Sequence, residues 1–426
     1  MTLGFSTFIK TALKVFILPS LAMAFSPAAW AYPVVLSAHQ VSQLQGMTRN
    51  QLVALRADEQ SGKRVALQID EVEDDAALVL REPYETRKLR ASLPHPKRSD
   101  PFSGRLQSVH RIVLDDRDFS NCNEACVKKL PETVKSVCGT PHAAILLKVT
   151  LTGTQKHAFI ADCGMQMNVF PTRDIKYDAT TRKISTPHYE YSYQSEKNVF
   201  FSSIKSSKNT TPILSSSELK AYLKPKYLFN MKFKDDDLVS QITSLSKGSQ
   251  SLSLEVAVAL NILAMKINNQ ICCDVSFFED SLYFPVVLDL PFAGDSFAKG
   301  SGVFFGFQSD PESKTQPQFI PASSPEASDA IVIQQEKELV VIGMRNPNRK
   351  SAELVRPQVV STKDMEKIKF MPVRSGTGIF YDIQNAKQGF QHFNVWMYFG
   401  AEQDRAKLID YAQHGLRATV ESMLIR

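Results

Sequence analysis

The chain has 426 residues, 43 % of them hydrophobic, and a formal net charge of +6 at neutral pH. A chain of this length and composition can bury a large core. Basic and acidic residues are mixed along the sequence, so the small positive charge argues against a nucleic-acid partner.

The first 31 residues have the pattern of an export signal. Lys10 and Lys14 precede an apolar run, and the segment closes on Ala29-Trp30-Ala31, the small-x-small pattern that a signal peptidase needs. The run is shorter than the roughly 20 residues that span a bilayer. We therefore predict residues 1–31 to be a signal peptide that is cleaved after Ala31, and a mature protein that starts at Tyr32. Because both lysines leave with the signal, the net charge falls from +6 to +4. We expect a periplasmic or secreted protein without a membrane span.

Residues 32–171 are predicted to form an N-terminal β-rich region, because apolar and polar residues alternate along several short stretches. Two hairpins are expected, from residues 52–57 with 64–72 and from residues 144–152 with 156–161. One helix is expected over residues 123–137, whose composition is helical.

Acidic residues end two of these predicted strands. Asp70 and Glu71 end one, and Asp115 and Asp116 end the other. If the two strand ends are neighbours, the carboxylates converge, and such hard oxygen ligands suit calcium. These four residues are a candidate calcium site, and we expect no other cofactor. The alternative is that the acids only cap the strands and keep sheet edges from pairing.

Four of the six cysteines lie close together in this region: Cys122, Cys126, Cys138 and Cys163. An even number of cysteines in an oxidising compartment predicts disulfides. We therefore expect bridges within this group, while the sequence leaves the pairing open. Zinc is the alternative, because the spacing of Cys122 and Cys126 is tolerable for a pair of ligands.

Residues 172–400 are predicted to form a large antiparallel β-sandwich, since the most β-like part of the chain covers residues 252–290. Residues 216–223 open with serines followed by Glu218, which predicts a short helix there. The clearest predicted helix is the last one, within residues 401–426. From Glu402 to Ile425, apolar residues recur mostly at three- and four-residue steps, so we expect this helix to pack on the sandwich.

Aromatic residues give a second candidate site. Tyr189, Tyr191 and Tyr193 share one face of a predicted strand, and Trp396 and Tyr398 share one face of another. Sugars stack their C–H faces on such rings, so a half-exposed aromatic face is typical of a glycan-binding sheet. The alternative is a cross-strand aromatic ladder that only holds the sheet together.

Signatures of catalysis are weak. Ser202 and Lys205 have the spacing of a Ser/Lys nucleophile pair, but no helix is predicted there. Paired carboxylates for glycoside hydrolysis meet only in three dimensions. We therefore predict an exported binding or envelope-associated module, with a glycan or another envelope component as its partner. The alternatives are a polysaccharide hydrolase or lyase, and a structural envelope protein without a small ligand.

Four stretches carry a resemblance to known proteins. Residues 68–72, 113–116 and 277–285 (QIDEV, VLDD and FFEDSLYFP) resemble a group of exported, uncharacterised Gram-negative proteins of β-sandwich character. Residues 396–400 (WMYFG), before the terminal helix, are similar to the end of the periplasmic β-supersandwich of the membrane insertase family. Both resemblances imply a sandwich, and neither implies a particular reaction.

Overall fold

The computed structural model describes most of the predicted mature chain. The described residues are 32–37, 40–56, 63–71, 110–121, 124–139, 141, 143–151, 154–164, 171–195, 198–226, 231–233, 238–262, 265–290, 293–309, 317–324, 327–345, 357–367, 376–384, 386–415 and 419–425. Residues from Ala31 to Arg426 form one compact unit, and the predicted signal lies outside the described residues. Within the described ranges, no helix has both the length and the apolar character that crossing a membrane requires.

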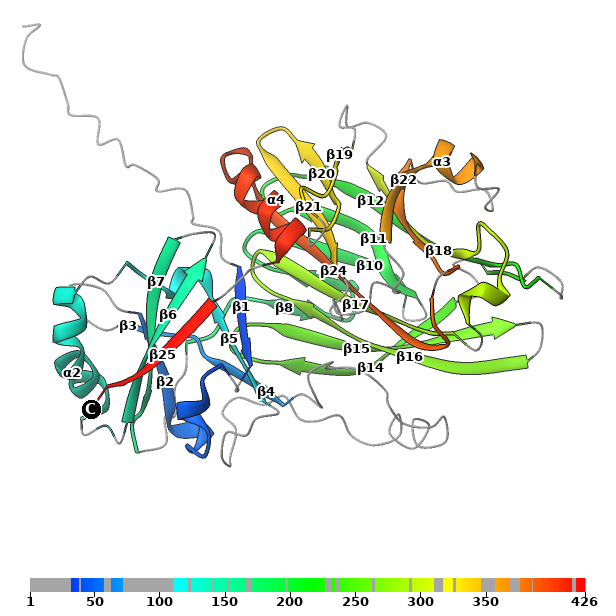
Figure 1. The fold of residues 1–426 in the computed structure, drawn as a ribbon. Helices are drawn as coiled ribbons and strands as arrows, with labels where there is room; N and C mark the ends of the chain where they lie inside the picture. The colour runs from blue at the N-terminus through cyan, green and yellow to red at the C-terminus, as the bar shows by residue number, and fades with distance from the viewer. Residues whose placement is uncertain are drawn as a thin grey trace, which may run out of the picture. The chain divides into compact units, whose positions relative to one another are not determined.

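The fold is mostly β and antiparallel, as predicted, and the strands of the described residues form four sheets (Figure 1). A three-stranded sheet has the order β1 (Pro33–Ser37), β5 (His110–Asp115), β4 (Gln68–Glu71). A five-stranded sheet has the order β25 (Thr419–Ile425), β6 (Ala143–Leu151), β7 (Thr154–Asp162), β2 (Leu52–Arg56), β3 (Lys63–Val65). These two sheets form a small sandwich.

The other two sheets form a large sandwich. The nine-stranded sheet has the order β22 (Pro357–Ser361), β23 (Thr377–Asp382), β18 (Gly302–Ser309), β12 (Leu214–Leu223), β11 (Asn198–Ser206), β10 (Tyr189–Ser195), β9 (Lys183–Ser185), β8 (Lys176–Asp178), with β13 (Met231–Phe233) paired to β12. The eight-stranded sheet has the order β14 (Leu238–Lys247), β15 (Leu252–Ile262), β16 (Met265–Phe277), β17 (Ser281–Leu290), β24 (Gly389–Ala401), β21 (Glu338–Arg345), β20 (Ala330–Gln335), β19 (Gln318–Ile320).

Among the described residues, the α-helices are α2 (Glu124–Cys138), α3 (Thr362–Lys367) and α4 (Arg405–His414), and the 3-10 turns are η1 (Ser42–Leu44), η2 (Arg49–Gln51), η3 (Asp116–Asp118), η5 (Gly294–Ser296) and η6 (Glu402–Asp404). The helix predicted over residues 123–137 is confirmed as α2.

The small sandwich is held by apolar residues on alternate positions of its strands. Leu36 and Ile112 from the three-stranded sheet pack in one buried cluster with Leu147 and Ile160 from the five-stranded sheet. The opposite face of the five-stranded sheet packs against α2. Since both faces of this sheet are covered, consecutive residues are buried in parts of β2, β6 and β7, at positions 52–55, 144–147 and 158–161.

The core of the large sandwich is aromatic. Tyr189 of β10 stacks on Phe399 of β24 with ring centroids 4.0 Å apart, and Tyr191 meets Phe277 edge to face at 5.1 Å. These contacts join the nine-stranded sheet to the eight-stranded sheet. Paired aromatic rings contribute beyond the area that they bury.

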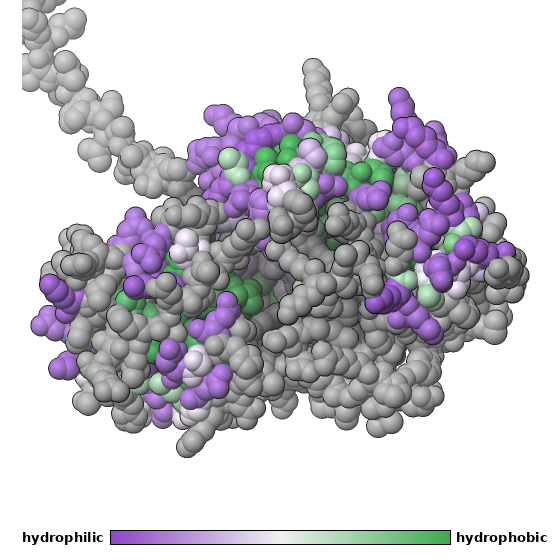
Figure 2. Space-filling view, in the orientation of Figure 1, coloured by the Kyte–Doolittle hydropathy of each residue, from purple (hydrophilic) through white to green (hydrophobic). Residues whose placement is uncertain are grey.

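Helix α4 covers the outer face of the eight-stranded sheet. Gly343 of β21 makes this close approach possible, because a Cβ there would come within 2.4 Å of the carbonyl oxygen of Ala412. In the space-filling view, hydrophilic side chains cover much of the described surface and hydrophobic ones show between them in two areas (Figure 2). Three large hydrophobic side chains of the described residues are exposed: Val35, Leu245 and Phe319.

The terminal helix is confirmed only in part. Helix α4 ends at His414, Gly415 adopts a positive φ of 80°, and residues 419–425 form β25 rather than a helical extension to Ile425. Strand β25 pairs with β6 along its whole length (Figure 1). The apolar residues of this stretch fit strand pairing as well as a helical period, and a glycine with positive φ ends the helix between the two halves.

The helix predicted over residues 216–223 is wrong, because these residues belong to β12. From Glu218 to Leu223, buried and partly exposed side chains alternate, as they do along a strand. Strand β18 pairs with this strand from Tyr222 to Leu214. The serines therefore belong to a ladder between two strands rather than to a helix cap.

One disulfide of the predicted group is present, between Cys138 and Cys163. It ties the last residue of α2 to the residue that follows β7, and both cysteines are buried. Cys122 and the side chain of Cys126 lie outside the described part, so their pairing stays a prediction.

The close packing of α4 on β21 can be tested with Gly343→Ala. Because the added methyl group would meet the backbone of Ala412, we expect the free energy of unfolding to fall by about 1 to 3 kcal/mol in urea denaturation. Gly376→Ala is the matched control, since a Cβ there meets nothing within 4 Å. Equal effects of the two substitutions would contradict the packing.

Candidate functional site

The candidate site begins where β5 leaves the small sandwich. Ile112 and Leu114 point into the core, and the chain then turns through η3 with the sequence Asp-Asp-Arg-Asp. The Asp115 side chain accepts a hydrogen bond from the Arg117 N–H at 2.9 Å, and Asp118 accepts one from the Asp115 N–H at 3.1 Å. This reciprocal capping box buries three carboxylates within one turn.

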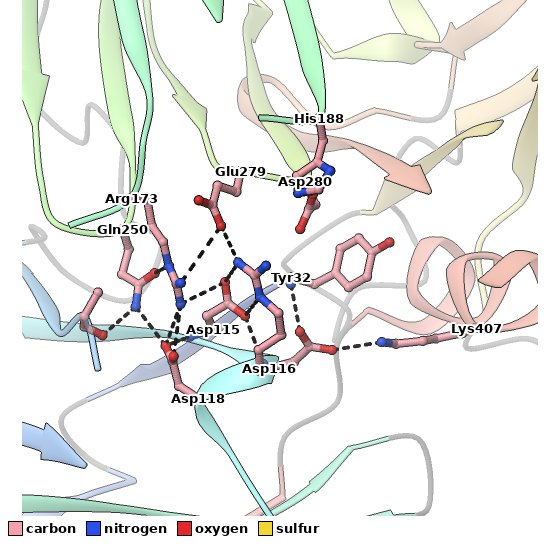
Figure 3. Close-up of polar contacts among 12 residues, drawn as sticks. Tyr32, Asp115, Asp116, Asp118, Arg173, His188, Gln250, Glu279, Asp280 and Lys407 are labelled. Carbon is pink, nitrogen blue, oxygen red and sulfur yellow. Dashed lines mark hydrogen bonds and ion pairs between the residues drawn. The ribbon is translucent and has the colours of Figure 1, made fainter. Parts of the chain in front are cut away.

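Two arginines pair with Asp115 and Asp118. Arg173, which precedes β8, contacts both oxygens of Asp118 at 3.0 Å and one oxygen of Asp115 at 3.2 Å. Arg117 contacts Asp115 and also reaches Glu279 between β16 and β17 (Figure 3). We name the five residues Asp115, Arg117, Asp118, Arg173 and Glu279 the ionic cluster.

Two glutamines extend the ionic cluster between the two sandwiches. Gln250, between β14 and β15, accepts a hydrogen bond from Arg173 at 3.1 Å and donates to Asp118 at 3.2 Å. Gln68 of β4 accepts from the N–H groups of Gln250 and Ser251 at 3.0 and 2.9 Å. The polar contacts thus join strand ends of the small sandwich to a loop of the large one.

A buried tyrosine holds the turn that carries Glu279. The Phe278 N–H donates to the Ser281 carbonyl at 2.8 Å, and the Tyr189 hydroxyl lies 2.9 and 3.0 Å from the carbonyl oxygens of these same two residues. On this turn, Asp280 lies 3.2 Å from Nε2 of His188 (Figure 3). Burial lowers the pKa of His188 to about 4, so the imidazole is neutral at physiological pH.

Burial dominates the electrostatics of the ionic cluster. It raises the pKa of Asp115 to about 7, against the opposing effect of Arg173 and Arg117, and it raises the pKa of Asp118. The pKa of Arg117 is raised overall. Burial alone would lower it, but the charge of Asp115 and its hydrogen bond to Arg117 outweigh that effect. Three carboxylates thus face two guanidinium groups, and one carboxyl is able to keep a proton near neutral pH.

Asp116 makes a separate ion pair beside the ionic cluster. One of its oxygens lies 2.9 Å from Nζ of Lys407 on α4, and the other accepts a hydrogen bond from the Tyr32 N–H at 2.9 Å (Figure 3). Turn η3, which follows β5, therefore also contacts α4.

The structure brings Asp115 and Asp116 together but gives them cationic partners. Asp70 and Glu71 lie on β4, in register with Arg111 and His110 of the neighbouring β5, and their side chains lie outside the described part. Among the described residues, no group of three or more His, Cys, Asp or Glu side chains could hold a metal ion. The calcium site stays a prediction.

The three predicted tyrosines of β10 are buried. Tyr189, Tyr191 and Tyr193 are 0 to 3 % exposed and face the interior of the large sandwich. Tyr193 reaches the hydroxyl of Tyr177 at 3.2 Å. Tyr189 and Tyr191 pack against rings of the eight-stranded sheet, and the three tyrosines leave no ring face at the surface for a ligand.

The other two predicted aromatic residues lie on the outer face of the eight-stranded sheet. Trp396 is partly exposed and stacks at 5.7 Å on Tyr398, which is buried. The sequence interpretation missed their neighbours Tyr283, partly exposed at 4.7 Å from Trp396, and Phe278 at 6.0 Å. We name these four residues the aromatic strip. The register of β17 against β24, which pairs Tyr283 with Trp396, is the information that the sequence lacked.

The sequence interpretation also missed the basic half of the ionic cluster. The signal available for Arg117 was the spacing of Asp115 and Asp118, which fits a capping box around it. Arg173 and Glu279 lie far from η3 in the sequence, and only the folded chain brings them together.

Comparisons with known proteins add little to this geometry. No family model matches the chain, and no curated protein does. Similar solved structures include an alpha-mannosidase from Enterococcus faecalis V583, at 10 % identity and a TM-score of 0.39, and a glycosyl hydrolase family 38 protein from Enterococcus faecalis, at 11 % and 0.43. Each covers 92 % of this chain, which spans only 44 and 45 % of theirs. Because TM-scores this low carry no argument, we base the functional proposal on the site.

The role of Arg173 in the ionic cluster can be tested with Arg173→Met. The substitution leaves Asp118 buried with too little compensating charge, so we expect a loss of about 3 to 5 kcal/mol in the free energy of unfolding, measured by urea denaturation. Lys176→Met is the control, because its ion pair with Asp174 is exposed and its loss should leave stability unchanged. A stable Arg173→Met protein would refute the role.

Proposed function

We propose that the protein is an exported binding module that takes a saccharide on the aromatic strip. The observation that carries this proposal is the partly exposed pair Tyr283 and Trp396, with ring centroids 4.7 Å apart on the outer face of a sheet. Two adjoining rings offer an apolar surface against which the C–H face of a pyranose can stack.

The strip is packed against buried rings, which favours binding. Phe278 and Tyr398 are buried next to Trp396, at 6.0 and 5.7 Å between ring centroids. The turn that carries Phe278 is itself held by the Tyr189 hydroxyl. A platform that is already ordered loses little side-chain entropy when a ligand binds.

Polar groups lie next to the strip. Glu279 follows Phe278 directly in the sequence and contacts Arg117. The side chain of Glu279 is 12 % exposed, and that of Arg117 is 25 % exposed. A carboxylate and a guanidinium held in this way can accept from and donate to sugar hydroxyls. This combination of rings and fixed polar groups is typical of ligand sites that orient a sugar.

The binding proposal predicts that Trp396→Ala weakens saccharide binding. Loss of one stacked ring should raise the Kd at least about tenfold, equivalent to roughly 1.4 kcal/mol. We would find the ligand by probing the mature protein on a broad glycan array, and measure Kd by titration calorimetry. Tyr283→Ala should act in the same direction.

Phe319→Ala is the matched control for this experiment. Phe319 is an exposed aromatic residue on β19, so its loss should leave the Kd unchanged. The proposal fails if the folded protein binds no glycan, or if the control weakens binding as much as Trp396→Ala does.

A polysaccharide hydrolase is the second candidate, favoured by one observation. Asp115, whose pKa burial raises to about 7, shares Arg117 with the carboxylate of Glu279. Two neighbouring carboxyl groups, one of them with a raised pKa, are the arrangement that glycoside hydrolysis uses.

The hydrolase candidate predicts release of new reducing ends from any glycan that the protein binds. Glu279→Gln keeps the shape of the side chain and should lower such a rate by at least about a hundredfold while binding persists. Binding by the wild-type protein without any release of reducing ends would exclude this candidate and leave the binding module.

A further inference from the structure

The first residue of the predicted mature chain is fully buried. Tyr32 is 0 % exposed, and both of its backbone polar groups contact Asp116, which is 2 % exposed. The Tyr32 nitrogen donates to Oδ1 of Asp116 at 2.9 Å, and the Tyr32 carbonyl accepts from the Asp116 N–H at 2.8 Å. Terminal residues are poorly ordered in most domains unless something ties them down.

The side chain of Tyr32 is held as firmly as its backbone. Its ring meets Tyr398 and Tyr411 edge to face, at 5.8 and 5.4 Å, and its hydroxyl donates to the Phe399 carbonyl at 2.8 Å. Nζ of Lys407 lies 5.0 Å from the centre of the ring. Tyr32 thus contacts η3 and also β24 and α4, two consecutive elements that lie far from it in the sequence.

Negative charge surrounds this residue. Burial, followed by Asp280, Asp404 and Asp116, raises the pKa of the Tyr32 phenol well above its usual value. Asp116 has a single cationic partner among the described residues, Lys407, which contacts only its Oδ2. Oδ1 of Asp116, which faces the Tyr32 nitrogen, is therefore placed to pair with a second positively charged group.

We propose that signal cleavage supplies that charge, and that the α-ammonium group of Tyr32 forms a buried ion pair with Asp116 in the mature protein. Hydrolysis of the Ala31–Tyr32 peptide bond consumes one water. The Ala31 carbonyl carbon becomes a carboxylate, and the Tyr32 nitrogen, no longer an amide, takes up protons to become an ammonium. The inference rests on the predicted cleavage after Ala31 and is independent of saccharide binding.

The ion pair couples processing to stability. A hydrogen bond from a charged donor to a buried carboxylate is roughly twice as strong as one from an amide. An uncleaved chain keeps only the amide N–H at this position, so its folded state lacks this contribution. In the mature chain, the new N-terminus lies against η3 and Lys407. The contacts of Tyr32 therefore stabilise the folded state more in the mature chain than in the uncleaved one.

Two forms of the protein that differ by one residue test the proposal. One begins at Tyr32, and the other begins at Ala31, so that the Tyr32 nitrogen stays an amide. We expect the Tm of the Tyr32 form to be higher by about 2 to 5 °C at pH 7. Asp116→Asn in both forms should abolish the difference, because the neutral amide cannot pair with an ammonium. Asp178→Asn, at the exposed end of β8, is the control that should preserve it.

Chemical labelling gives a readout that does not depend on the variants folding. In the folded Tyr32 form, the α-amine should react with an acylating reagent at least about tenfold more slowly than in urea, because it is buried and because the adjoining Asp116 carboxylate keeps it protonated. The α-amine of the Ala31 form is the comparison and should react freely. Equal Tm values for the two forms, labelling of folded Tyr32 at the unfolded rate, or an exported protein that begins at another residue would each overturn the proposal.

Discussion

The structure depends on the burial of charge where β5 ends. Asp115, Asp116 and Asp118 leave the small sandwich in a single buried turn, and a buried carboxylate without a partner costs several kcal/mol. Their partners, among them Arg173 and Lys407, come from elements associated with the large sandwich. Neither sandwich can therefore bury this junction without the other, which agrees with the single compact unit formed by residues 31–426.

The same junction positions the proposed binding surface. The turn at residues 278–281 presents Glu279 to the ionic cluster and Phe278 to the aromatic strip. Tyr189 holds this turn from inside the large sandwich. Tyr189, which the sequence predicted as a ligand contact, is thus a positioning residue. The rings that can contact a ligand are those of Tyr283 and Trp396.

Local patterns predict much of the fold but little of the site. Alternation along residues 144–161 predicts a hairpin, because each of these strands pairs with the strand next to it in the sequence. The helix at residues 124–138 is predicted by its composition. The strand at residues 419–425 is missed, since its partner β6 lies far away in the sequence. For the same reason Asp115 and Asp116 are found as a charged strand end, while Arg173 and Glu279, which decide what those acids do, are not. Tyr191 is buried, whereas Trp396 is partly exposed. The sequence could not predict this difference, because alternation alone cannot tell the inner face of a sheet from the outer one.

The central claim, that the ionic cluster makes the two sandwiches fold as one unit, is tested most directly by hydrogen exchange followed by mass spectrometry across a urea series. Peptides from β6 and β7 report on the small sandwich, and peptides from β20 and β21 report on the large one. In the wild-type protein, both sets should lose protection at the same urea concentration. In a protein with both arginines of the ionic cluster replaced by methionine, the two sets should separate. Separate transitions in the wild-type protein, or coincident ones in the doubly substituted protein, would contradict the account.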